Sequence, residues 1–101
     1  MFDKLFEAQQ KAGEVKQRLD AITVSGIAEG GKITVTANAN KVVQSVVIDE
    51  DFFKGADREE LEELLVVAVN KAMAQADNVS QSEMAAMTKD MFGGMGGLFG
   101  K

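Results

Sequence analysis

Residues 32–49 read KITVTANANKVVQSVVID, and the hydrophobic pattern of this stretch decides the fold. From Lys32 to Asn38, apolar and polar side chains alternate with the two-residue period of a strand that buries one face. Asn38 to Lys41 is typical of a turn, because asparagine tolerates a positive φ. Val42 to Ile48 is predicted to form the next strand. The short connection predicts that the two strands are neighbours and antiparallel.

An earlier strand is predicted from about Ile22 to Ala28, joined to the next by the turn Glu29-Gly30-Gly31. The result is a three-stranded antiparallel meander with helices on only one side, since one face is apolar and the other polar. The stretch from Gly26 to Lys32 also matches seven positions of a phosphate-binding P-loop. Because the eighth residue is Ile33 instead of Ser or Thr, and because a strand follows instead of a helix, we interpret the stretch as a hairpin turn.

Residues 3–21 are predicted to form a helix with a heptad-like apolar stripe that favours packing against another helix. The stripe consists of Leu5, Ala8, Ala12, Val15, Leu19 and Ile22. The opposite face is expected to carry basic residues mixed with acids. These basic residues are Lys4, Lys11, Lys16 and Arg18.

A second helix is predicted to begin at Asp57, because Asp57 and Glu60 have the spacing of a capping box. It is expected to run to about Asp77. Ser80 to Glu83 either caps a further helix or lies within a continuing one. Residues 92–101 are rich in glycine and are expected to form a flexible tail after a single domain of residues 1–91. The apolar stripe of the second helix consists of Leu61, Leu64, Leu65, Ala68, Ala72 and Ala76.

The composition excludes several classes of enzyme. The 101 residues include neither Cys nor His, which removes thiolate metal sites, the usual general base and the commonest transition-metal ligand. We therefore expect no catalytic residue, no metal, no cofactor and no small-molecule substrate. No apolar run approaches ~20 residues, so no membrane span is predicted. The N-terminus does not have the pattern of a signal peptide, and the cytoplasm is the default location.

The charge is unevenly distributed along the chain. The net charge is −5, yet residues 49–64 alone hold eight acids and two bases, so the rest of the chain is slightly positive. A calcium loop is not indicated there, because Phe52-Phe53 fills the middle and Gly55 has the wrong offset. We interpret the acidic segment as a solvated loop between strand and helix. The acidity argues against strong DNA binding, which depends on neutralising phosphates.

The order of these features resembles the YbaB/EbfC family of bacterial nucleoid-associated proteins over nearly the whole chain. The resemblance is carried by Val46-Val47-Ile48-Asp49, by Ala68-Val69-Asn70-Lys71-Ala72, and by the Met-rich segment and Gly-rich tail that follow. It implies an intertwined, tweezer-like homodimer in the nucleoid. It also implies binding of double-stranded DNA with little sequence preference, and a role in nucleoid organisation and gene regulation. The tail lacks the proline usual in the family, and the turn at residues 38–40 lacks the usual glycine.

The sequence thus predicts an α+β fold: a helix, a three-stranded antiparallel meander, a second helix, and a short helical or extended C-terminal tail. The DNA-binding residues are expected among Lys4, Lys11, Lys16 and Arg18. Asn70 is expected to form a structural link to the sheet or to a partner chain, since a buried amide needs hydrogen bonds. The alternative is a dimeric protein-interaction module with negligible DNA affinity, linked to replication or recombination machinery.

Overall fold

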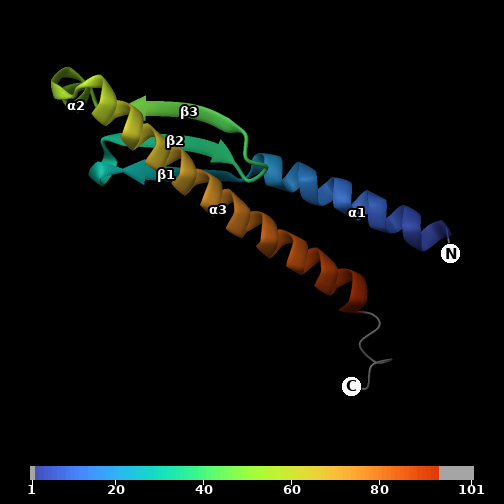
Figure 1. The fold of residues 1–101 in the computed structure, drawn as a ribbon. Helices are drawn as coiled ribbons and strands as arrows, with labels where there is room; N and C mark the ends of the chain where they lie inside the picture. Colours follow the sequence, from blue (N-terminus) through green and yellow to red (C-terminus); the bar gives the residue numbers. More distant parts are fainter. Residues whose placement is uncertain (1, 94–101) are drawn as a thin grey trace.

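The structure is a computed structural model that describes the backbone of residues 2–93 and the side chains of residues 5–7 and 9–89. A three-stranded sheet lies at one end of an elongated molecule of 63 × 26 × 17 Å. One long helix crosses the sheet and continues beyond it, towards the same end as the first helix (Figure 1). The elements are α1 (Phe2–Ala21), β1 (Thr23–Ala28), the 3-10 turn η1 (Glu29–Gly31), β2 (Ile33–Asn38), β3 (Val43–Ile48), α2 (Glu50–Gly55) and α3 (Arg58–Gly93).

The sheet is the predicted antiparallel meander, with the strand order β1-β2-β3. Val35 in the central strand lies opposite Gly26 on one side and opposite Val46 on the other. Gly30 and Gly31 in η1 have φ angles of +62° and +105°, which glycine adopts without the steric cost of a Cβ. The stretch that resembled a P-loop is therefore a hairpin turn, as predicted.

The main core lies between α3 and the first two strands. Ala68, Ala72 and Ala76 of α3 are fully buried, and they pack with Ile33 and Val35 of β2. Their small side chains allow the helix to approach the sheet closely. The predicted apolar stripe of this helix is thus confirmed, and α3 covers only one face of the sheet (Figure 1).

A smaller core joins α1 to α3. Val15 and Leu19 are buried against Ala39 of the β2–β3 turn, with Val79 and Met87 of α3 beside them. The predicted stripe of α1 is only partly used: Leu5 is 60% exposed and Ala12 is also exposed. The first half of α1 therefore extends past the region where it packs.

One prediction about the helices is corrected, and one open alternative is decided. The acidic segment holds a short helix, α2, whose first turn is capped by Asp49: the Asp49 Oδ2 accepts a hydrogen bond from the Phe52 N–H at 3.0 Å. Of the two alternatives at Ser80 to Glu83, the continuing helix is correct, because α3 runs unbroken to Gly93. It thus enters the predicted tail by two residues, and the remainder, residues 94–101, lies outside the described residues.

Candidate nucleic-acid interface and apolar face

The basic residues of α1 do not share one face. Lys11 and Arg18 line a hollow of about 150 Å³ between α1 and α3, together with Val15 and Met87. The prediction that they lie opposite the apolar stripe is wrong. Positions four before and three after Val15 lie on the same side of a helix as Val15 itself, which is the side facing α3.

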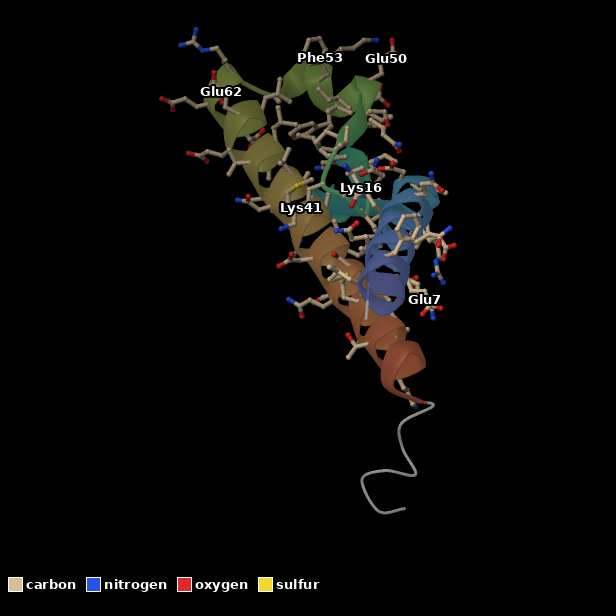
Figure 2. The ribbon with its side chains drawn as sticks, turned by 90° about the vertical axis from the view of Figure 1, so that its right-hand side faces the viewer. Glu7, Lys16, Lys41, Glu50, Phe53 and Glu62 are labelled. Atoms are coloured by element: carbon tan, nitrogen blue, oxygen red, sulfur yellow. The ribbon has the colours of Figure 1, made fainter. Side chains whose placement is uncertain are left out.

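Arg18 is already engaged within the chain. Its Nε lies 3.3 Å from Oε1 of Glu83 on α3, so this ion pair links the two helices. Lys16 is exposed on another side of α1 (Figure 2). The side chain of Lys4 lies outside the described part of the structure. The structure thus brings Lys11 and Arg18 together and leaves Lys16 apart from them.

The acidic residues of the segment 49–64 gather at the end of the molecule away from the tip of α1. Glu50, Phe53 and Glu62 lie at one end, whereas Glu7 lies towards the far end of α1 (Figure 2). Phe53 is 58% exposed among these acids. Among the described residues, no three acidic side chains come together in a way that could hold a metal ion. The acidic excess of the sequence thus lies at one end of the molecule, while the rest of the chain is close to neutral.

Two polar contacts join α3 to β1. The Lys71 Nζ donates to the Ile27 carbonyl at 3.2 Å, and the Gln75 Oε1 accepts from the Ser25 N–H at 2.8 Å. Both contacts lie on the β1 flank of α3. They give hydrogen-bond partners to an edge strand, which otherwise exposes unpaired backbone groups.

Because α3 is held over β1 and β2, an apolar surface remains uncovered on the β3 flank. Val46 pairs with the buried Val35 and lies on the same sheet face, yet it is 44% exposed. A groove of about 470 Å³ runs along this side of α3, and its wall is mostly apolar. We call this surface the β3–α3 face; it consists of Val43, Val46, Leu65, Val66 and Val69.

Asn70 also lines this groove and is exposed. Within the protomer it is therefore not a buried amide linked to the sheet, which corrects the first of its two predicted roles. β3 is the last strand of the sheet, so its outer edge also borders the β3–α3 face.

None of the helices in the described part of the chain combines the length and apolar character needed to cross a membrane. The comparison with family models gives a match to residues 1–91, described as the YbaB/EbfC DNA-binding family. The chain belongs to the YbaB/EbfC family. The resemblance seen in the strand and helix motifs is thus confirmed.

Similar proteins come from several bacteria. A nucleoid-associated protein of Flavobacterium johnsoniae is 37% identical, and the match covers 98% of this chain and 94% of that protein. A nucleoid-associated protein of Bradyrhizobium diazoefficiens is 36% identical, with 100% and 94% covered. A crystal structure of an uncharacterized protein from Helicobacter pylori has a TM-score of 0.73 at 15% identity, covering 83% of this chain and 88% of that one. At this level of identity, the likeness shows that the two chains share a fold and nothing more.

The sequence interpretation missed the β3–α3 face, although a signal was present. Val42-Val43 and Val46-Val47 place apolar residues on both faces of β3, which breaks the alternation seen in β2. A strand that is apolar on both faces is typical of one covered on both sides. In the protomer, Val43 to Val47 of β3 are exposed and only Ile48 is partly buried against the core.

Proposed function

We propose that this chain forms a two-fold homodimer that binds double-stranded DNA in the bacterial nucleoid, with little preference for sequence. The observation that carries the proposal is family membership over residues 1–91, joined to relatives named nucleoid-associated proteins. A role in nucleoid organisation and gene regulation follows from the same relationship. The proposal includes no catalytic activity.

The β3–α3 face supports the homodimer. Two-fold dimers use the same patch on both subunits, and burying apolar surface drives association. The exposed Val46 and Val66 are suited to such a patch, and the free edge of β3 offers backbone groups beside it. Asn70, at the border of the groove, would then meet the partner chain.

The location of the acidic block supports a DNA site on the helical arms, by which we mean residues 5–15 of α1 and 80–89 of α3, because the arms are close to neutral and the other end is strongly acidic. Lys11 lies within the α1 arm, and Lys4 and Lys16 flank it in the sequence. The acids from Asp49 to Glu63 lie at the other end of the molecule. Like charges repel the phosphate backbone, so the acidic end should face away from DNA. Arg18 is paired with Glu83, which reduces the charge it offers.

A salt titration tests this proposal. Affinity for two unrelated duplexes should be similar, because phosphate contacts carry no sequence information. The log–log slope should be modest, at about −0.9 per phosphate neutralised, since few bases are available. Fluorescence anisotropy with labelled duplexes measures both quantities. Absence of binding by the unmodified protein at low salt would contradict the proposal.

A matched pair of double variants tests the location of the site. Lys11→Glu with Lys16→Glu should weaken binding to both duplexes alike, while Lys54→Glu with Arg58→Glu should leave it nearly unchanged. Both pairs change the net charge equally, but the second lies at the acidic end. Equal losses in the two double variants would show that only total charge matters. Circular dichroism checks that both remain folded.

The acidic end favours one alternative function. The net charge of −5 and the exposed Phe53 among acids suit a dimeric protein-interaction module with negligible DNA affinity, linked to replication or recombination machinery. A charged rim around an exposed aromatic residue is common in protein interfaces. The low-salt binding experiment separates the two functions, because this module would not retain DNA.

A further inference from the structure

The β2–β3 turn lies at the junction where α1 leaves the sheet beside α3. Ala39 in this turn is 1% exposed and packs against Val15 and Leu19 of α1. Its backbone N–H donates to the carbonyls of Leu19, at 3.1 Å, and Ile22, at 3.0 Å. The last carbonyls of a helix lack partners within the helix, so this turn supplies what a C-terminal cap normally supplies.

Two asparagines shape the turn and tie it to α1. The Asn38 Oδ1 accepts from the N–H groups of Asn40, at 2.9 Å, and Val42, at 3.1 Å, which closes the turn. The Asn40 Nδ2 donates to the Lys16 carbonyl at 2.9 Å and to Oδ1 of Asp20 at 2.6 Å. The Asn38 Nδ2 reaches the same Asp20 oxygen at 3.5 Å. The Asp20 carboxylate thus accepts hydrogen bonds from the side-chain amides of both asparagines.

The same turn is tied to α3. The Lys41 Nζ lies 2.8 Å from Oδ1 of Asp77, and Lys41 itself has a φ of +69°, which directs the chain back into β3. Lys16 and Lys41 both lie near the middle of the molecule, between its two ends (Figure 2). The turn is therefore held by one helix on each side.

We propose that Asn38, Asn40 and Asp20 are positioning residues that set the angle between α1 and α3. This inference rests on the proposed function, since that angle fixes where the basic side chains of α1 meet DNA. Further along α1, the Arg18–Glu83 ion pair and the packing of the buried Val15 against Met87 also hold the helices together, but a partly solvent-exposed ion pair and non-directional apolar packing fix the angle only loosely. The turn contributes backbone hydrogen bonds and the buried amide of Asn38, which restrict the direction of α1 relative to α3 more than those contacts do.

The test measures arm geometry and DNA affinity separately. The sequence has no cysteine, so Cys at the exposed positions Gln10 and Gln81 accepts spin labels at those two sites only. Double electron–electron resonance spectroscopy then measures the distance between the two labels on α1 and α3. Labelled protein is diluted with unlabelled protein, so that most of the measured label pairs lie within one protomer. Asn40→Ala should broaden this distance distribution. Asn78→Ala, an exposed asparagine on α3, should not.

Variants of Asp20 separate position from charge. Asp20→Ala and Asp20→Asn remove the same charge, but the amide oxygen of asparagine still accepts a hydrogen bond from Asn40. Asp20→Asn should keep the narrow distance distribution, and Asp20→Ala should broaden it. DNA affinity of Asp20→Ala should be weaker than that of Asp20→Asn by about three- to tenfold, the range expected for losing the short hydrogen bond from Asn40.

The outcomes are distinguishable. Unchanged distances in Asn40→Ala overturn the inference. Broadened distances with DNA affinity equal to that of Asn78→Ala also overturn it, while the proposed function stands. No DNA binding by the unmodified protein at low salt overturns the proposed function, and with it the link between this turn and DNA. Broadened distances together with the Asp20 affinity difference support the inference.

Discussion

Gly26 is the residue whose missing side chain determines how closely α3 approaches the sheet. It lies in β1 beneath α3, and a Cβ built on it would overlap the backbone of Ala68 and Ala72. Backbone atoms of a buried helix cannot move aside as the end of a flexible side chain does. The close contact between α3 and the sheet therefore depends on this glycine.

We predict that Gly26→Ala lowers the free energy of unfolding by about 3 kcal/mol or more, because the overlap forces α3 away from the fully buried Ala68 and Ala72. Gly13 is the control: it lies in α1 with no other atom within 4 Å of its built Cβ. Gly13→Ala should stabilise the protein by about 0.5–1 kcal/mol, since alanine favours a helix over glycine. Urea unfolding measures both. Equal effects of the two variants would contradict the close-approach argument.

The site residues on α1 could be predicted only in part. The stripe on α1 was assigned from the spacing of apolar residues, and it included Leu5 and Ala12, which the fold leaves exposed. Val15 and Leu19 of the same predicted stripe are buried, and Lys11 and Arg18 flank them. A helix shows several apolar alignments, and the tertiary partner selects one of them.

At the scale of elements, the start of α3 was predicted correctly. The Asp57 Oδ1 accepts a hydrogen bond from the Glu60 N–H at 2.9 Å, which is the expected N-terminal cap. We predict that Asp57→Ala lowers the free energy of unfolding by about 1 kcal/mol, because it leaves that N–H without this acceptor. Asp57→Asn should retain most of the stability, since asparagine is an equally good cap. Thermal unfolding distinguishes the two, and equal losses would contradict a capping role.

The strands and their antiparallel order could be predicted from the alternating pattern and the short turns, whereas α2 and the length of α3 could not. α2 has six residues, too few for a helical period to be visible, and its two adjacent phenylalanines suggest no single face. Ser80 to Glu83 has the composition of a helix start, but it lies within α3, where Glu83 pairs with Arg18. The useful signal was the lack of Gly and Pro between Ala56 and Phe92, which leaves nothing to end the helix.

At the scale of the whole molecule, the uncovered β3–α3 face is the main consequence of where α3 lies. We predict that Val66→Asp shifts the protein from dimer to monomer and lowers its stability, because a charge would be buried in the proposed interface. Val67→Asp is the control: Val67 is the next residue on α3 and 41% exposed, but it does not line the groove. Sedimentation at micromolar concentration measures the assembly. A folded monomer of the unmodified protein would contradict the dimer.

The length of α3 makes it a lever. Ala76 is the last of its three fully buried alanines, and the helix continues to Gly93, about 17 residues or ~26 Å further at 1.5 Å per residue. A tilt of about 5° around the Ala76 contact would move the far end by about 2 Å, by the same helix geometry. A shift of α3 by a fraction of an ångström where it packs on the sheet therefore becomes a displacement several times larger at the C-terminal end of the helix. Substitutions deep in the core should therefore alter the reach of a surface that they never touch.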